Sequence, residues 1–540
     1  MSKKKKRNVL YFLIDSLRYD VFKNRDEARE LVPNLSKLID KGFVHKITSN
    51  GMITTLALPS IFTQTYPFDY GGINYGIKQR PKSFVELIKQ EGYVTHYITT
   101  HYTTGPRRDY ERGFDFTRGI YDNESIIEMY LRHIFSYEIE LCERGEISEE
   151  ELLSSLQKNF GVILKYAEWS GVGIKKTFMP RRLQIPSRKM SQQYRAEREL
   201  LTFNPEAVLE KIKNIPTSQY YLSLGIEKLK YRLIIWRYFE LLQSISNRLF
   251  KMVTRSGLTL FHDYVSPIAR EAIDEALKFM KPSREPWFIM LHVMDVHQGA
   301  NIRRLGNFIY KLHYFPKLFR IRKRYGGERN IWYDISLMYV DSQAKRLINK
   351  LEELDLFDDT VIMVSGDHGR GWDPGRDIKY QSELGLRTYY EQINAALIFS
   401  NGSCDPSFEG LHDGMSISAT LLDELGIAPD CTFKGISVYK QGRKAVITEG
   451  YERRNCDLTR RDLAFTVTGK DLKLMVKLKK DQLKTVRLYD LKTDPNEFIN
   501  MIDSDDYQKE INLLMEELVS QRKDLLQKRN VDVSKYKKTI

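Results

Sequence analysis

Cysteine is scarce in this chain, which has only four among its 540 residues. No two of them form a Cys-x-x-Cys pair, so the sequence contains neither a zinc-ribbon nor a thioredoxin motif. Isolated cysteines in so long a chain are typical of reduced thiols in a cytosolic protein. The four are Cys142, Cys404, Cys431 and Cys456.

Long apolar runs are also absent. No stretch reaches the roughly 18 uninterrupted apolar residues that a membrane-spanning helix needs. A basic segment, Lys3–Arg7, precedes an apolar run over residues 9–14, which resembles the start of a signal peptide. However, the run ends at Asp15 and no small-residue cleavage site follows it. We therefore interpret it as a buried strand and expect a cytoplasmic protein.

No recognisable nucleic-acid-binding module is present, although the formal net charge is +14. A basic surface also attracts anionic membranes and anionic small substrates, so the charge alone does not select a partner. We expect no nucleic-acid partner. The hydrophobic share of 42% is enough for a sizeable core, and the aromatic share of 12% argues against global disorder.

Strand and helix patterns alternate in two parts of the chain, which predicts an α/β fold with a parallel-rich sheet. We predict two halves of one α/β domain at 1–119 and 283–430, a helical insertion at 120–282, and a C-terminal α+β region with a charged helical tail at 431–540. The predicted strands are 8–14, 93–99, 287–293, 360–365, 395–399, 445–449, 463–468, 472–478 and 485–489. The predicted helices outside the insertion and the tail are 26–41, 83–91, 331–354 and 415–425.

One stretch of the insertion, Lys228–Arg255, interleaves large apolar residues with Lys and Arg. A basic amphipathic helix of this kind can lie on an anionic membrane. It can equally pack on the core as a lid, which is the more frequent outcome. Peripheral membrane contact therefore stays open at this point.

Metal-ligand residues follow the predicted strands of the α/β domain. Asp15 ends the first strand, and Asp367-His368 follows the strand at 360–365 between two glycines. In an open parallel sheet, ligands bind beyond the carboxyl ends of the strands. A single Asp at such a place is usually a helix cap, but the joint occurrence of these residues favours a divalent cation site.

Four segments resemble the sulfatase family, within the alkaline phosphatase superfamily. Asn8–Arg18 is similar to its opening strand, where the family has a metal-binding Asp; its second Asp is replaced here by Ser16. Tyr333–Gly369 is similar to the second metal motif, and His292–His297 to the strand that delivers an active-site His. Tyr489–Asn500 is similar to the C-terminal signature. The resemblance implies an alkaline-phosphatase-like fold and a metal-dependent enzyme.

The expected nucleophile of a sulfatase is missing. The family carries a Cys or Ser, converted to formylglycine, two residues before a Pro-Ser pair; here the pair is Pro59-Ser60 and the position holds Ala57. The segment is more similar to the phosphoethanolamine transferase branch, in which a Thr five residues before the proline is nucleophile and metal ligand. This register points to Thr54, with Thr55 as the neighbouring candidate; the alternative is that both only cap a helix. Metal coordination would lower the pKa of such a hydroxyl.

Further side chains are candidates for substrate contacts. His297 could stabilise the transferring group or protonate the leaving oxygen. Arg387 lies where sulfatases often have a substrate-contacting Lys and could bind an anionic oxygen bidentately, although a surface Arg is the simpler interpretation. His292 and His412 rank lower, because an extended strand would point His292 away from His297.

The sequence therefore predicts a hydrolase or transferase that acts on a phosphate or sulfate ester of a small molecule or glycan. Asp15, Thr54, Asp367 and His368 would bind a divalent cation (Zn, Mn, Mg or Ca). A role in making surface polysaccharide follows only by analogy. The alternative is an inactive protein of the same fold that binds an anionic glycan or partner, which Ala57 and Ser16 motivate. The oligomeric state is not readable from the sequence.

Overall fold

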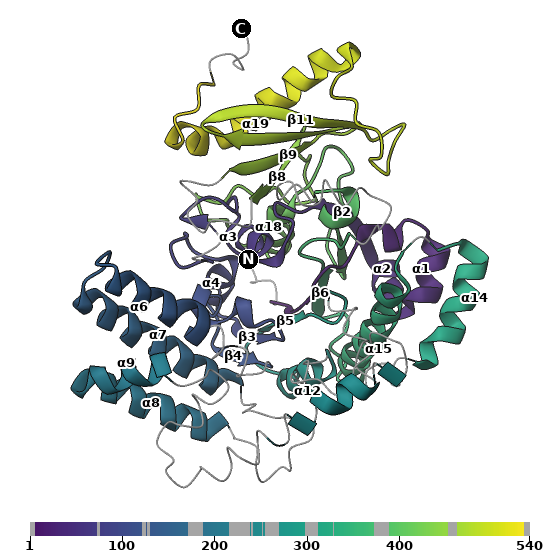
Figure 1. Cartoon of the computed structure of the whole chain (residues 1–540). Coiled ribbons are helices and arrows are strands. Elements are labelled where there is room, and N and C mark those ends of the chain that lie inside the picture. The colour runs from purple at the N-terminus through teal and green to yellow at the C-terminus, as the bar shows by residue number, and fades with distance from the viewer. Residues whose placement is uncertain are drawn as a thin grey trace.

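A seven-stranded sheet forms the centre of the molecule, and helices cover it on both faces (Figure 1). The structure is a computed structural model. It describes residues 6–72, 76–120, 126, 130–170, 187–214, 238, 241–242, 244–250, 252–253, 269–297, 312–327, 329–371, 388–451 and 462–533.

The strand order in this sheet is β2-β7-β6-β1-β5-β3-β4. All neighbours from β6 to β4 pair in parallel, and β7 alone runs antiparallel to the strands on either side of it. The parallel-rich α/β sheet predicted from the sequence is thus confirmed. The strands are β1 (Asn8–Ile14), β2 (Gly42–Thr48), β3 (Val94–Thr99), β4 (Phe116–Gly119), β5 (Trp287–Val293), β6 (Thr360–Ser365) and β7 (Asn394–Ser400).

The central strands are buried on both faces, which explains why they are continuous apolar runs. Every residue of β5 and β6 is buried. One face packs on α1 (Arg25–Leu31), α2 (Pro33–Asp40), α12 (Ala269–Phe279), α14 (Phe315–Tyr325) and α15 (Ile331–Glu353). The other face packs on α3 (Thr54–Thr63), α4 (Phe84–Gln90) and α18 (Gly414–Glu424).

A second sheet lies beyond α3 and α18 and is entirely antiparallel, in the order β11-β10-β9-β8 (Figure 1). Its strands are β8 (Val446–Tyr451), β9 (Leu463–Thr468), β10 (Leu472–Lys479) and β11 (Gln482–Asp490). The long helix α19 (Gln508–Lys528) packs on it. Leu56 of α3 and Met415 of α18 belong to the apolar cluster of the second sheet, so these two helices contact both sheets.

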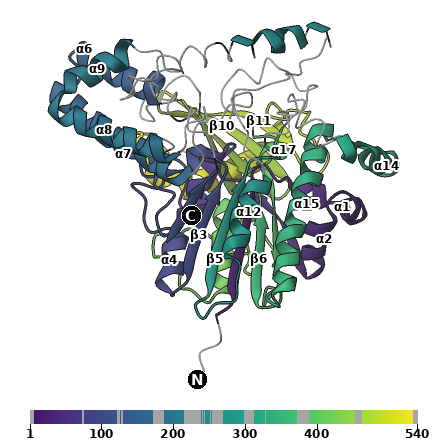
Figure 2. The same ribbon diagram turned by 90° about the horizontal axis from the view of Figure 1, so that it is seen from below.

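The described part of the predicted insertion is helical and has its own apolar cluster. It contains the π-helical turn Tyr130–Phe135 and the helices α6 (Ser136–Glu143), α7 (Glu149–Ser170), α8 (Ser187–Phe203) and α9 (Pro205–Asn214). Figure 2 shows these helices far from the N-terminal end of β1, on the side where the parallel strands end. The exact domain boundaries stay a prediction.

Several elements differ from the sequence-based expectation; β4 and α14, for example, were not predicted. The helix expected over 26–41 is two helices, because Pro33 forces the preceding residue, Val32, out of the helical region (φ −131°, ψ 65°). Strand β2 was not predicted, since it begins directly after α2 without a turn signal. None of the helices in the described ranges has the length and apolar character needed to cross a bilayer.

The basic stretch Lys228–Arg255 lies largely outside the described residues. Its described part is helical, at 238, 241–242, 244–250 and 252–253. Large apolar side chains there are exposed rather than packed on the core: Tyr238, Leu241, Leu242, Ile245, Leu249, Met252 and Val253.

Candidate metal centre

Two neighbouring parallel strands deliver the carboxylates of the site. Strands β1 and β6 pair with Leu13 opposite Ser365, so the same register places Asp15 beside Asp367. Ser16 connects the two: its N–H donates to Asp367 Oδ1 at 3.1 Å, and its hydroxyl donates to Asp15 Oδ1 at 2.8 Å. Ser16 has a φ of 67°, a conformation that costs free energy for a residue other than glycine. The bridge between the carboxylates thus holds the chain in a strained turn.

Thr54 lies at the first residue of α3, as expected for a helix N-terminus. Its hydroxyl donates to Asp15 Oδ2 at 2.9 Å and lies 3.3 Å from His368 Nε2. Thr54 is buried, whereas Thr55 is only half-buried and points to a different side of the helix start. Ala57 lies almost one turn further along and is fully buried. The structure therefore brings Thr54 together with the predicted metal ligands.

The strand β5 lies on the other side of β1 and adds two imidazoles. His292 Nε2 is 3.5 Å from Asp15 Oδ2, and one nitrogen of His297 lies within 4.8 Å of the ligand atoms of Asp15 and His368. The sequence argument ranked His292 low, because alternation along a strand would separate it from His297. That argument fails here because β5 ends at Val293 and the chain then turns, so both side chains reach Asp15.

His368 has the tautomer that a metal ligand needs. Its Nδ1 is 2.6 Å from the carbonyl oxygen of Gly369. Since a carbonyl only accepts hydrogen bonds, Nδ1 carries the proton and Nε2 presents a lone pair. This Nε2 lies 3.4 Å from Asp367 Oδ2 and 3.8 Å from Asp15 Oδ1. Lone pairs of nitrogen and oxygen converge here.

Charge crowding shifts the pKa values of these groups. Burial acts to raise the pKa of Asp15, but the imidazoles of His297, His292 and His368 outweigh it and hold the pKa well below its ordinary range. Burial and the charge of Asp15 both raise the pKa of Asp367. Burial lowers the pKa of His297 to about 4, and nearby Arg370 contributes to this shift.

Several buried polar atoms of the site have no hydrogen-bond partner within the described residues. They are Asp367 Oδ2 and both ring nitrogens of His292. Leaving a buried polar atom unpaired costs free energy, so such atoms indicate a group that binds between them. Carboxylate and hydroxyl oxygens with an imidazole nitrogen are a donor set that suits a divalent cation. Asp15, Thr54, Asp367 and His368 therefore fit the predicted metal.

Of the remaining sequence candidates, those that the structure describes do not join this cluster. Arg387 lies outside the described residues. Both nitrogens of His412 have partners elsewhere, His45 Nε2 at 3.0 Å and the carbonyl oxygen of Lys440 at 3.1 Å. Asp295 accepts a hydrogen bond from the N–H of Ala269 at 2.8 Å, at the start of α12. Asp295 is therefore a helix cap, the simpler of the two interpretations for a carboxylate after a strand.

One residue near the site was missed by the sequence analysis. Arg370 Nη1 lies 2.8 Å from His297 Nε2. The only sequence signal is that Arg370 directly follows Asp367-His368-Gly369, so it leaves the same strand end as the metal ligands. An arginine on an exposed loop would look the same in the sequence.

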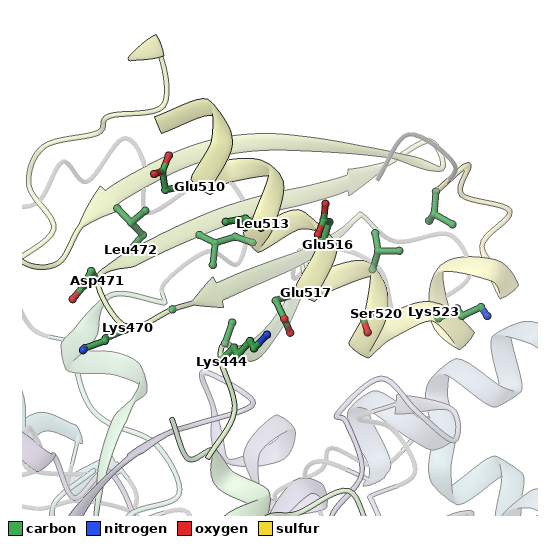
Figure 3. A pocket seen from close by; sticks show the side chains of 15 residues that line it. Lys444, Lys470, Asp471, Leu472, Glu510, Leu513, Glu516, Glu517, Ser520 and Lys523 are labelled. Carbon is green, nitrogen blue, oxygen red and sulfur yellow. The ribbon is translucent and has the colours of Figure 1, made fainter. Parts of the chain in front are cut away.

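A cavity of about 880 Å³ lies elsewhere, in the C-terminal region between α19 and the second sheet (Figure 3). Its walls carry charges of both signs, among them Lys470, Lys523 and Glu517, and its lining includes Leu472 and Leu514. None of the candidate site residues contributes to it.

The chain matches one protein-family model, described as Sulfatase, over residues 7–164 and 203–423. This match confirms the family resemblance that the sequence motifs indicated. No curated protein matches the sequence.

Solved structures with the same fold extend over nearly the whole chain. A candidate sulfatase from Bacteroides fragilis is 14% identical, with a TM-score of 0.55 over 100% of this chain and 99% of that one. A 2-O GAG sulfatase is 12% identical, with a TM-score of 0.53 over 96% and 93%. The phosphonate monoester hydrolase of Agrobacterium radiobacter is 14% identical, with a TM-score of 0.51 over 96% of each chain. At such identities the similarity shows the fold alone.

Proposed function

The chain belongs to the sulfatase family of ester hydrolases, and we propose that it is an active metal-dependent hydrolase or transferase of phosphate or sulfate esters with Thr54 as nucleophile. The observation that carries this proposal is the position of Thr54. Its hydroxyl lies between Asp15 Oδ2 and His368 Nε2 at the start of α3. A threonine that only capped the helix would have no reason to be buried among metal-ligand side chains.

The proposed ligands are Asp15, Thr54, Asp367 and His368, with Zn, Mn, Mg or Ca as the cation. A bound divalent cation lowers the pKa of a coordinated hydroxyl and neutralises charge on the transferring group. Asp15 Oδ2 accepts the hydrogen bond of the Thr54 hydroxyl and so orients it. With a cation bound, the hydroxyl would release its proton to water, because the low pKa of Asp15 makes this carboxylate a poor base. His368 is oriented by its bond to the Gly369 carbonyl.

The reaction proceeds in two displacements. Thr54 Oγ1 attacks the phosphorus or sulfur atom, a new ester bond to Thr54 forms, and the bond to the leaving oxygen breaks while that oxygen takes up a proton. Water or an acceptor alcohol then attacks the same atom and restores the Thr54 hydroxyl. The backbone N–H groups at the start of α3 face the anionic oxygens of the transferring group. Hydrolysis and transfer differ only in the acceptor.

The proposed substrate is a phosphate or sulfate ester of a small molecule or glycan. Ala57 offers no side chain for formylglycine chemistry, which favours phosphoryl transfer over the usual sulfatase mechanism. Structures with the same fold include a 2-O GAG sulfatase and a phosphonate monoester hydrolase, so both ester classes belong in the first screen. The cytoplasmic location and a role in making polysaccharide stay predictions.

The test is a screen of the metal-loaded protein on an aryl phosphate, an aryl phosphodiester and an aryl sulfate. We expect Thr54→Ala to lower the best activity at least about 10³-fold, because the nucleophile is lost. Thr55→Ala is the matched control and should stay within about threefold. Mass spectrometry of the peptide that contains Thr54 should detect the covalent adduct. Equal activity of both variants would refute the assignment.

The alternative is an inactive member of the fold that binds an anionic glycan. Ser16 in place of a second metal-binding Asp, and Ala57, are the residues that favour it. If the metal-loaded protein turned over none of the three esters while Thr54→Ala still bound a sulfated oligosaccharide as tightly as the wild type, this alternative would replace the enzymatic function.

Peripheral contact with an anionic membrane is a separate proposal. Ile245 and Leu249 are exposed and lie four residues apart in the helical stretch 244–250, so they share one face. The described residues Tyr238, Leu241, Leu242, Met252 and Val253 are also exposed. Flanking Lys and Arg residues of the stretch complement anionic headgroups. We expect binding to phosphatidylglycerol vesicles but not to phosphatidylcholine vesicles, and Leu241→Ser with Ile245→Ser should weaken it. If the wild type floated with neither kind of vesicle, the membrane contact would be excluded.

A further inference from the structure

The side chain of Gln392 links two chain segments that meet at the candidate metal centre. Gln392 belongs to the short helix α17 (Tyr390–Ile393), directly before β7, and its side chain is half-buried. Its Nε2 donates to the carbonyl oxygen of Met52 at 2.6 Å, and its Oε1 accepts a hydrogen bond from the N–H of Gly371 at 2.9 Å. The carboxamide therefore uses both its donor and its acceptor between segments that are distant in the sequence.

The backbone of Gln392 contacts the metal motif as well. Its carbonyl oxygen accepts a hydrogen bond from the N–H of Gly369 at 2.8 Å. The carbonyl oxygen of Gly369 in turn accepts the hydrogen bond at 2.6 Å from His368 Nδ1 that orients this imidazole. A Cβ at Gly369 would lie 2.0 Å from the carbonyl oxygen of Glu391, so only glycine allows the two segments to approach so closely. Gln392 thus contacts the first and the third residue after His368.

Met52 lies two residues before Thr54, in a turn that the start of α3 does not anchor by itself. The N-cap residue of α3 is Ile53, whose apolar side chain makes no capping hydrogen bond. Helices are usually anchored at this end by a Ser, Thr, Asp or Asn cap. Here the hydrogen bond from Gln392 to the carbonyl oxygen of Met52 comes from outside the helix. The place of Thr54 is therefore supported by a contact that also reaches the metal motif.

The same turn is held at a second point further upstream. The N–H of Ser49 donates to the carbonyl oxygen of Ile393 at 2.7 Å, and the Ser49 hydroxyl donates to the carbonyl oxygen of Asp367 at 2.7 Å. These bonds fix the chain where it leaves β2. The bond from Gln392 to Met52 is the nearer of the two anchors to Thr54.

The quantity that this nearer anchor controls is the position of the Thr54 hydroxyl, which lies 2.9 Å from Asp15 Oδ2 and 3.3 Å from His368 Nε2. The side-chain hydrogen bonds of Gln392 go to backbone atoms and not to the side chains of the candidate ligands. Gln392 therefore influences the reaction through Thr54. Misplacing a reacting atom by about 1 Å is enough to cost about 10²-fold in rate.

We propose that Gln392 is a positioning residue, which ties the turn before α3 to the chain after His368 and so holds the Thr54 hydroxyl at the metal centre. The inference rests on the proposed function and deepens it. Loss of the Gln392 carboxamide lowers kcat and leaves KM unchanged, because the substrate is bound as before while the nucleophile is misplaced.

The experiment compares Gln392→Leu and Gln392→Glu with the wild type in the metal-loaded protein, with p-nitrophenyl phosphate as the probe. Glutamate has the shape of glutamine and keeps an acceptor for the N–H of Gly371, but it turns an oxygen toward the carbonyl oxygen of Met52. We expect both variants to lower kcat at least about tenfold and to keep KM within about twofold. If Gln392→Glu kept the wild-type kcat, or if the loss of kcat/KM came from KM, the proposal would be wrong.

Gln521 provides the matched control, since it makes the same kind of link away from the metal centre. Its Nε2 donates to the carbonyl oxygen of Ala445 at 2.9 Å, and its Oε1 accepts a hydrogen bond from the Tyr66 hydroxyl at 2.7 Å. Gln521→Leu should lower the free energy of unfolding to a similar extent as Gln392→Leu, because similar hydrogen bonds are lost. It should nevertheless keep kcat and KM within about twofold. A loss of kcat as large as that of Gln392→Leu would reveal a general effect of weakened packing and overturn the proposal.

Hydrogen exchange tests the link without turnover. The N–H groups of Leu56 and Ala57, in the first turn of α3, both donate to the carbonyl oxygen of Ile53 at 2.9 Å. We expect the peptide that contains these amides to exchange at least about threefold faster in Gln392→Leu than in the wild type, because this helix start has lost its nearer anchor. The peptide that covers β11 should exchange equally in both proteins. Faster exchange in both peptides, or in neither, would contradict the role of Gln392.

The outcomes also distinguish this inference from the proposed function. If the wild type hydrolyses no ester but exchange at the start of α3 rises only in the Gln392 variants, the link between α3 and the metal motif stands and the catalytic proposal fails. If the wild type is active through Thr54 and the Gln392 variants keep its kcat and its exchange, catalysis stands and the role of Gln392 is wrong.

Discussion

Two buried clusters of charged side chains differ in how their charges are paired. At the junction with the second sheet, Arg522 is almost fully buried and donates from Nε to Glu449 Oε1 at 2.5 Å and from Nη2 to Asp69 Oδ1 at 3.0 Å. The other oxygen of Glu449 accepts from the N–H of Phe68 at 2.7 Å. The guanidinium carbon lies 4.2 Å from the centre of the Tyr66 ring. Every carboxylate oxygen of Glu449 is thus satisfied.

The candidate metal centre has carboxylates that are just as deeply buried but no such cation. Within the described residues, neither Asp15 nor Asp367 has an ion pair with Lys or Arg, and Asp367 Oδ2 has no hydrogen-bond partner. A buried charge is tolerated when it is paired, and it is costly otherwise. In the first cluster the protein itself supplies a partner for each oxygen of Glu449, whereas the second cluster leaves Asp367 Oδ2 available to a ligand.

The largest effect should come from removing the cation of the paired cluster. Arg522→Ala leaves Glu449 and Asp69 buried without their partner, and we expect it to lower the free energy of unfolding by about 3–5 kcal/mol. Urea unfolding followed by circular dichroism measures this. Arg29→Ala, which removes an exposed ion pair with Asp40, is the control and should cost less than about 1 kcal/mol. If Arg522→Ala lowered the free energy of unfolding as little as Arg29→Ala does, the Arg522 cluster would have no structural role.

The pH dependence of stability provides a second test of the cluster around Glu449. Burial raises the pKa of Glu449 to about 7, although Arg522 acts to lower it. A carboxyl with a raised folded-state pKa binds its proton more tightly in the folded protein, so its contribution is full at acidic pH. That contribution, about 4 kcal/mol, is lost as the pH rises from about 4.3, the unfolded-state value, to about 7. Between these pH values, the free energy of unfolding should change less with pH in Glu449→Gln than in the wild type. Equal changes in the two proteins would refute this prediction.

A smaller effect is expected when a cation binds to the unpaired cluster. Saturating cation at 100 times its dissociation constant should stabilise the wild type by about 2.7 kcal/mol. Asp367→Asn should lose this gain. In a chelator, however, the variant should be at least as stable as the wild type at pH 7, because the raised pKa of Asp367 means that its ionisation opposes folding. Thermal unfolding with Zn, Mn, Mg and Ca in turn measures both.

The control for this prediction is Asp26→Asn, which changes an exposed carboxylate in α1 and should respond to the cation like the wild type. If the chelated Asp367→Asn protein were destabilised as strongly as Arg522→Ala, the two clusters would play the same structural role.

Much of the fold could be predicted because local sequence patterns indicate most of its strands. The strands β1, β5, β6 and β9 have the bounds predicted from the sequence, because a strand that is buried on both faces is a nearly continuous apolar run. Strand β2 was not recognised, because only Lys41 separates it from α2. The antiparallel direction of β7 is also invisible in the sequence, since an apolar run reads the same in either direction.

Asp15 and Asp367-His368 were found from the sequence because each directly follows a strand. Neighbouring parallel strands carry such residues to one edge whatever the rest of the chain does. Thr54 needed the family resemblance in addition, since a threonine at the start of a helix is an ordinary cap. The sequence by itself thus determined the fold class, the family and the position of the carboxylates.

Only the tertiary structure decided which side chains meet them. His292 and His297 both approach Asp15 because β5 ends between them, a turn that alternation along a strand does not anticipate. Arg370 contacts His297 across 73 residues of sequence, and no local pattern encodes such a contact. The physical reason is the same in both cases. Short-range patterns determine where a strand begins and ends, but the partner of a side chain beyond the strand end depends on how separate segments pack.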